Sequence, residues 1–196
     1  LISDSTTFGV TVVKNDADTA THTYNAYQIF KGDLLVKTDS TRTLSNIQWG
    51  DGISATAANF ASLKTDLCAI SSAFSGITFE NTAASATAVA KAISDLNLTD
   101  DSDAAQKLAD AFSKILGTAS GTGSATGVTG LKGGYYLIKD ANAVTGNGAS
   151  TRFILQVLAD MKVYEKASVP SVDKKVRDET ADKETGADDE GWGDSA

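Results

Sequence analysis

The sequence MKVYEKASVPSVDKKV, residues 161–176, joins an apolar, strand-like run to the only proline of the chain. Residues 177–196 follow it and are rich in Asp, Glu and Gly, with too few apolar side chains to bury a core. The fold is therefore expected to close at or near this stretch. We expect one domain over residues 1–168, followed by a linker and the start of a truncated second domain over residues 169–196.

The composition excludes several classes of partner. The chain has 196 residues and a net charge of -8, and no segment clusters Lys or Arg, so neither a nucleic acid nor an anionic membrane surface is expected to bind. No apolar run is long enough to span a bilayer, so no membrane insertion is expected. The polar start reads as mature polypeptide, and we expect any targeting sequence to have been removed or to lie outside this sequence.

Cysteine and histidine each occur once, as Cys68 and His22. A single cysteine excludes an intramolecular disulfide, and we interpret Cys68 as a small buried or half-buried hydrophobic residue. His22 lies in a distant strand-like segment and the carboxylates are scattered along the chain, which argues against a transition-metal site. We therefore expect no metal, no other cofactor and no enzyme activity, because no nucleophile, base and orienting group come together.

The first third of the chain predicts β-strands. Residues 8–13 have the β-branched content of a strand, and residues 22–30, HTYNAYQIF, are expected to form the second arm of a hairpin with them. A turn is expected at residues 31–33, followed by strands at residues 34–37 and 44–49. One face of the predicted strand 22–30 carries Tyr24, Ala26, Gln28 and Phe30.

The middle of the chain predicts helices. Apolar residues recur at spacings of three and four in residues 57–74, 82–96 and 102–116, as they do on one face of an amphipathic helix. Asp100, Asp101 and Ser102 supply N-cap chemistry for the last of these helices. We interpret the helical segment, about residues 57–116, as a structural insertion packed on a sheet.

The last third returns to strands. The Gly-rich residues 117–134 are expected to be a flexible connector, and they lack the GKS or GKT sequence of a phosphate-binding loop. Strands are expected at residues 135–140 and 151–158, and residues 161–166 are expected to close the sheet. Strands at both ends with helices between them indicate an α+β fold, a mostly antiparallel β-sandwich with a helical insertion, rather than a doubly wound sheet.

Several segments, in their order and spacing, resemble the backbone pilins of Gram-positive bacteria, whose subunits are joined covalently by sortases. The segments are HTYNAYQIFKGDL, NIQWGDGI, GGYYLIKD, FILQV and MKVYEKASVPSVDKKV. The resemblance implies an Ig/Cna-like sandwich and a structural subunit of an extracellular, cell-wall-anchored pilus. It also implies two partners, identical subunits in a head-to-tail fibre and a class C sortase.

The resemblance assigns a role to one lysine of this domain. In these pilins the last strand of the first domain carries a Tyr-Pro-Lys type motif, which corresponds here to Tyr164, Glu165 and Lys166, with Glu165 at the proline position. The Lys166 amine is then expected to accept the C-terminal threonine of another subunit from the sortase. The alternative is that Lys166 is an ordinary solvated lysine at the end of a strand.

The resemblance also bears on bonds within one subunit. Lys174, with Lys175 as second choice, corresponds to the first-strand lysine of the next domain, which commonly forms an intramolecular amide with an Asn of that domain. In residues 1–168, Lys14 is a candidate for such a lysine, but Lys139 stands at the acid position and the closing strand has no Asn. We therefore expect no internal isopeptide bond in residues 1–168.

A second function stays open at this point. The helical insertion or the Gly-rich segment would bind a host glycan or matrix protein in an adhesin module, with a host receptor as partner. An exposed Trp49 would support this alternative, although a tryptophan in a short strand is more often an anchor of the core.

Overall fold

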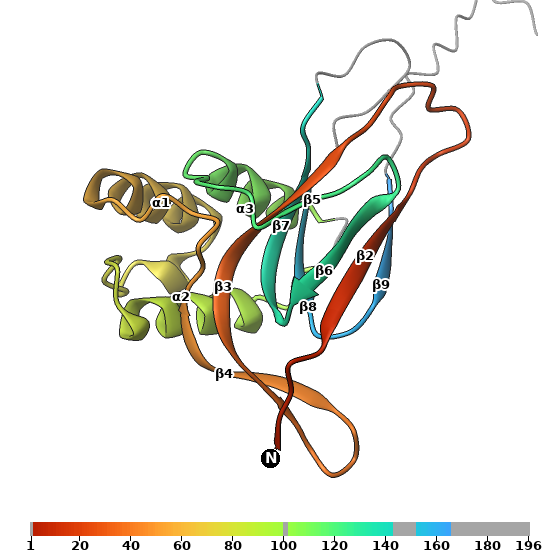
Figure 1. Cartoon of the computed structure of the whole chain (residues 1–196). Helices are drawn as coiled ribbons and strands as arrows, with labels where there is room; N and C mark the ends of the chain where they lie inside the picture. The colour runs from red at the N-terminus through yellow and green to blue at the C-terminus, as the bar shows by residue number, and fades with distance from the viewer. Residues whose placement is uncertain (1, 100–101, 143–151, 166–196) are drawn as a thin grey trace, which may run out of the picture.

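The computed structural model describes residues 2–99, 102–142 and 152–165 of the chain. The fold is α+β, with three α-helices and two sheets among these residues. In Figure 1 the helices lie against one side of the larger sheet, and the smaller sheet lies on its other side. The expected α+β class is therefore confirmed.

The larger sheet is antiparallel and is built around one long strand, β3 (Tyr24–Val36). The strands run in the order β1-β3-β7-β8, and both β4 and β5 also pair with β3. The other strands of this sheet are β1 (Ile2–Ser3), β4 (Arg42–Trp49), β5 (Gly121–Thr122), β7 (Gly134–Asp140) and β8 (Arg152–Val157).

The expected turn at residues 31–33 is wrong, because β3 runs through it without a break. The pairing of β3 with β4 shifts register between Lys31 and Asp33, which marks a bulge. A Cβ atom at Gly32 would lie 2.4 Å from the carbonyl oxygen of Ser45 in β4. Gly32 therefore allows the backbones of β3 and β4 to approach closely, which is a common role of glycine inside a sheet.

The smaller sheet has the order β6-β2-β9. Its strands are β2 (Thr7–Val13), β6 (Gly127–Lys132) and β9 (Met161–Tyr164), of which β6 is antiparallel and β9 parallel to β2. The expected hairpin between residues 8–13 and 22–30 is therefore wrong, because β2 and β3 belong to different sheets. The expected closing strand is confirmed as β9.

The Gly-rich residues 117–134 are not a flexible connector, since they contain β5 and β6. Their glycines allow two stretches of backbone to touch. A Cβ at Gly123 would lie 1.9 Å from the carbonyl oxygen of Gly127, and Gly127 itself has a φ of +136°. The composition that suggested flexibility instead permits tight packing.

The helices are α1 (Ala57–Ile70), α2 (Ala83–Asp95) and α3 (Asp103–Ser113), and the 3-10 helix η1 (Ser72–Phe74) follows α1. All three predicted helices are confirmed, although the first and third end earlier than expected. Each begins at a hydroxyl side chain that accepts a hydrogen bond from the first turn, namely Thr56, Thr82 and Ser102.

Two hydrophobic clusters hold these layers together. One lies between the helices and the larger sheet, and the other takes buried residues from both sheets. Phe30 belongs to the helix-facing cluster, whereas Tyr24 and Ala26 belong to the other, so the predicted face of β3 is broken. A register shift between Gln28 and Phe30 causes this change of side.

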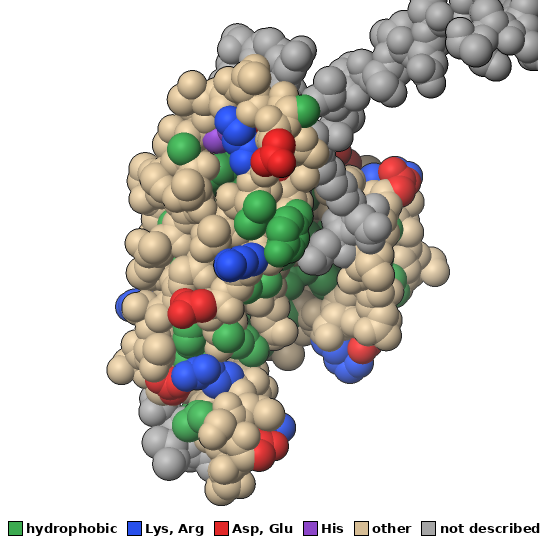
Figure 2. Space-filling model, turned by 90° about the vertical axis from the view of Figure 1, so that its right-hand side faces the viewer, with side chains coloured by type: hydrophobic (Ala, Val, Ile, Leu, Met, Phe, Trp, Pro, Cys, Tyr) green, Lys and Arg blue, Asp and Glu red, His purple; other side chains and the backbone are tan. Residues whose placement is uncertain are grey.

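Figure 2 views the molecule from the side of the smaller sheet. Lysine and arginine side chains are interspersed there with aspartate and glutamate, and a few hydrophobic side chains show between them. Among the described residues, no helix is long and apolar enough to cross a membrane.

Candidate functional site

The loop between β2 and β3 carries an aspartate that points inward. The Asp18 backbone N–H donates to the carbonyl oxygen of Asn15 at 2.9 Å, and the Asp18 Oδ1 accepts the N–H of Ala20 at 2.7 Å. This Asx-type turn is local and follows from an Asp with a free N–H two residues later. The carboxylate of Asp18 is buried, with its Oδ2 left for a partner outside the turn.

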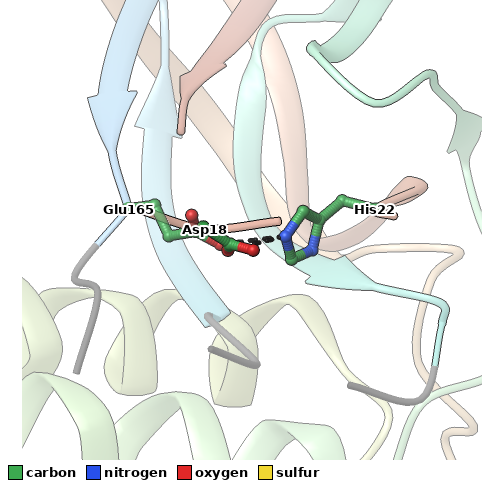
Figure 3. A group of neighbouring side chains, drawn as sticks. All are labelled: Asp18, His22 and Glu165. Atoms are coloured by element: carbon green, nitrogen blue, oxygen red, sulfur yellow. Dashed lines mark hydrogen bonds and ion pairs between the residues drawn. The ribbon is translucent and has the colours of Figure 1, made fainter. Parts of the chain in front are cut away.

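His22 lies four residues after Asp18 and is also buried. Its ring stacks on the ring of Tyr24 with centroids 5.7 Å apart. The Nε2 atom lies 2.8 Å from Asp18 Oδ2 and 3.5 Å from Glu165 Oε1, and the Nδ1 atom is hydrogen-bonded to Asp140 Oδ2. Figure 3 shows the carboxylates of Asp18 and Glu165 together on one side of the His22 ring.

Asp140 is the last residue of β7 and faces the other ring nitrogen. Its Oδ1 accepts the N–H groups of Thr23, at 3.2 Å, and Asn142, at 2.9 Å, which leaves Oδ2 for His22. Since a carboxylate only accepts hydrogen bonds, Nδ1 must be the donor of this pair. Asp140 thereby sets the orientation of the imidazole.

Glu165 directly follows β9 and is hydrogen-bonded to the end of β2 and to the start of the loop between β2 and β3. Parallel pairing places Tyr164 beside Val13, and the N–H of Glu165 donates to the carbonyl oxygen of Val13 at 2.8 Å. The Oε2 atom accepts the N–H of Asn15 at 3.4 Å. The side chain of Tyr164 is 67% exposed, whereas Glu165 is buried, so the two neighbours point in opposite directions.

We call Asp18, His22, Asp140 and Glu165 the His22 cluster. Burial alone would lower the pKa of His22, but its hydrogen bonds to Asp140 and Asp18 raise it above the ordinary value. Burial and the neighbouring Asp18 raise the pKa of Glu165. Burial opposes ionisation of Asp18 too, yet hydrogen bonds with Ala20, Glu165 and His22 lower its pKa to about 2. The cluster therefore keeps Asp18 ionised, and it shifts both His22 and Glu165 toward their protonated forms.

Three members of the cluster have the geometry of metal ligands. One ligand atom each from Asp18, His22 and Glu165 lies within 4.8 Å of the others. The expectation of no metal relied on carboxylates that are scattered in the sequence, and folding brings three of them to His22. Sequence reasoning missed Asp18 and Asp140 as site residues, because the only local signal was an Asp four positions before the one histidine.

The structure describes only part of the site that the sequence predicts. Tyr164 and Glu165 are described, whereas Lys166, Lys174 and Lys175 lie outside the described residues, and their assigned roles stay predictions. Glu165, which stands at the proline position of the motif, is buried and lies beside His22.

An exposed Trp49 would have supported the adhesin alternative, but this side chain is buried. Trp49 is 5% exposed, stacks on Phe30 at 5.0 Å and donates its Nε1–H to the carbonyl oxygen of Glu80 at 2.8 Å. It is an anchor of the core. Cys68 is half-buried against the same cluster, as expected.

Comparison with protein-family models finds no match for the sequence, and comparison with curated proteins finds none either. Among solved structures, the chain is similar to the full-length RrgB pilus protein of Streptococcus pneumoniae, with 14% identity and a TM-score of 0.26 over 84% of this chain and 31% of that one. A structure of the RrgB pilus backbone from the same organism has 14% identity and a TM-score of 0.24, over 81% of this chain and 40% of that one. The chain thus spans about a third of these pilus proteins, and similarity this weak does not by itself establish a common fold.

Proposed function

We propose that the chain is part of a structural, non-enzymatic subunit of a covalently polymerised pilus on the cell surface. Residues 1–168 form the first domain, and residues 169–196 are the linker and the start of a second domain. The subunit is extracellular and anchored to the cell wall, and a class C sortase joins it head-to-tail to identical subunits. This proposal is supported first by the sequence segments that resemble Gram-positive backbone pilins.

The structural observation that carries the proposal is the way the last described strand ends. Glu165 is held by its N–H to Val13, by its carboxylate to Asn15 and by His22. Lys166 is the next residue in the sequence. An acceptor amine has to be presented reproducibly to an acyl-enzyme, and a fixed preceding residue limits the space that the amine searches.

The proposed chemistry is an acyl transfer. The sortase holds the C-terminal threonine of one subunit as an acyl-enzyme, and the neutral amine of Lys166 attacks its carbonyl carbon. A C–N bond forms, the amine loses a proton and the nucleophile of the enzyme leaves, so an amide joins the two subunits. Unlike a noncovalent contact, this amide is not released when a domain unfolds under load.

Two finer statements belong to the same proposal. The first is that the fold is an Ig/Cna-like β-sandwich, which is supported by the hydrophobic cluster that the two sheets share. The second is that Lys174, or failing that Lys175, forms an intramolecular amide with an Asn of the second domain, outside residues 1–196.

The test is a polymerisation reaction with the cognate sortase and a subunit that bears the sorting motif, followed by mass spectrometry of the joined peptide. Lys166→Ala is expected to abolish the product. Lys162→Ala is the matched control, because Lys162 is an exposed lysine of β9 and is expected to leave polymerisation unchanged. Normal polymerisation of the Lys166→Ala variant would refute the assignment.

A further inference from the structure

The His22 cluster gathers three potential ligand atoms at one point. They are Asp18 Oδ2, His22 Nε2 and Glu165 Oε1, and their side chains are at most 1% exposed. We propose that Asp18, His22 and Glu165 bind one divalent metal ion, with Zn²⁺ as the preferred ion. Metal binding at this site does not require the proposed pilus function, because Lys166, the proposed acceptor of the acyl group, is not one of its ligands.

The imidazole is oriented as a metal ligand. Its Nδ1 is committed to Asp140, a carboxylate that is itself held by the N–H groups of Thr23 and Asn142. Histidine ligands commonly donate their second ring N–H to such a carboxylate, which fixes the tautomer and turns the other nitrogen toward the metal. In this chain the other nitrogen is Nε2, and it faces Asp18 and Glu165 (Figure 3).

The spacing of the three ligand atoms suits a metal ion. Asp18 Oδ2 lies 2.8 Å from His22 Nε2, and Glu165 Oε1 lies 3.5 Å from it. An ion bound here would replace the protons on Nε2 and on Glu165, because metal ligands bind in their deprotonated forms. A zinc ion binds each ligand at about 2.0–2.2 Å, so two ligands of a tetrahedron lie about 3.3 Å apart. The distances of 2.8 and 3.5 Å from Nε2 lie on either side of that separation.

The donor set selects the class of ion. Imidazole nitrogen and carboxylate oxygen are both ligands of Zn²⁺, and imidazole also suits other first-row metals, whereas Ca²⁺ and Mg²⁺ prefer sets made only of oxygen atoms. The single cysteine, Cys68, lies in α1 and belongs to another cluster. Three protein ligands leave one tetrahedral position for water.

A bound ion would link three segments that are distant in the sequence. Asp18 and His22 belong to the loop between β2 and β3, Glu165 follows β9, and Asp140 connects the imidazole to the end of β7. Because ligands are arranged only in the folded chain, the ion would stabilise the fold in proportion to its concentration.

The test uses the full chain, stripped of metal with a chelator and titrated with Zn²⁺ in competition with a chromophoric chelator. The wild-type protein is expected to bind one ion and to unfold at a higher temperature with it. Glu165→Gln is expected to weaken Zn²⁺ binding by about tenfold or more, whereas Asp16→Asn, an exposed carboxylate of the same loop, is expected to change nothing.

Glu165→Gln also distinguishes the loss of a metal ligand from a loss of folding. Glutamine has nearly the same shape and still donates a hydrogen bond to Asp18, so the variant is expected to keep the circular dichroism of the wild type without metal. Anomalous diffraction at the zinc edge, from crystals of the wild type, should place the ion beside Nε2 of His22. Equal Zn²⁺ affinity of wild type and Glu165→Gln, no one-to-one binding, or an ion found elsewhere would overturn the proposal.

Discussion

His22, two residues before β3, is hydrogen-bonded through Nδ1 to Asp140, the last residue of β7, although 118 positions separate them in the sequence. The same ring faces Asp18 and Glu165 through Nε2. A single imidazole thus connects the loop after β2, the end of β7 and the end of β9. Glu165, which directly follows the last described strand, is one of the partners of this ring.

The stability of the metal-free protein is expected to fall as the pH rises above the ordinary pKa of histidine, about 6.5. The folded state raises the pKa of His22, so protonation of His22 stabilises the fold below the unfolded pKa and this contribution is lost as the pH rises through the folded pKa. The raised pKa of Glu165 acts in the same direction. Thermal unfolding with a chelator present, followed by circular dichroism, measures the effect.

The control for this pH dependence is His22→Gln, which removes the titrating ring. It is expected to be less stable at all pH values, because the buried carboxylates of Asp18 and Asp140 lose a cationic partner, and to show a flatter profile over the same pH range. An equally steep profile in this variant would assign the effect to other groups.

Trp49→Ala is expected to lower the free energy of unfolding by about 3–5 kcal/mol, the usual cost of removing a large buried aromatic ring. The ring packs between Phe30 and Phe60, with centroid distances of 5.0 and 4.9 Å. Tyr164→Ala is the control, since the side chain of Tyr164 is 67% exposed and its loss is expected to cost less than about 0.5 kcal/mol. Urea unfolding followed by circular dichroism compares the two, and equal costs would contradict the burial of Trp49.

Gly127→Ala is expected to be far more damaging than Gly130→Ala, although both glycines lie in β6 and have positive φ. A Cβ at Gly127 would lie 2.0 Å from the carbonyl oxygen of Val10, so the pairing of β6 with β2 would have to open. A Cβ at Gly130 meets nothing within 4 Å, and only the cost of a left-handed conformation remains, about 1–2 kcal/mol. Denaturant midpoints of the two variants measure the difference, and similar midpoints would refute this account of the sheet.

The full chain is expected to show the intact mass that its sequence predicts. Formation of an isopeptide bond requires a desolvated, neutral lysine. Lys14 is exposed and donates a hydrogen bond to the backbone oxygen of Ala20 at 3.0 Å, and the position proposed for the acid holds Lys139. A mass lower by one ammonia would show that an internal bond has formed.

Local patterns in the sequence predicted most of the elements. Apolar spacing placed the three helices, because residues such as Phe60, Leu63 and Leu67 recur with the helical period and face one core. Alternation placed the strands, but not their partners. Gly32 and the Gly-rich residues 117–134 were misread, because a glycine that permits flexibility and a glycine that permits close strand contact look the same in a sequence.

The site was predictable only in part. The sequence drew attention to Tyr164 and Glu165 through a resemblance, and to His22 only as the single histidine. The burial of Glu165, and the convergence of Asp18 and Asp140 on His22, depend on which strands become neighbours.

The sequence by itself therefore determined the local elements: three amphipathic helices, strands at both ends and a closing strand near residue 164, each of which follows from side-chain periodicity over a few turns. The tertiary structure alone decided that β9 runs parallel to β2, and that this pairing carries Glu165 to His22. The physical reason is that strand pairing and charge burial depend on contacts between residues more than a hundred positions apart, which no local pattern encodes.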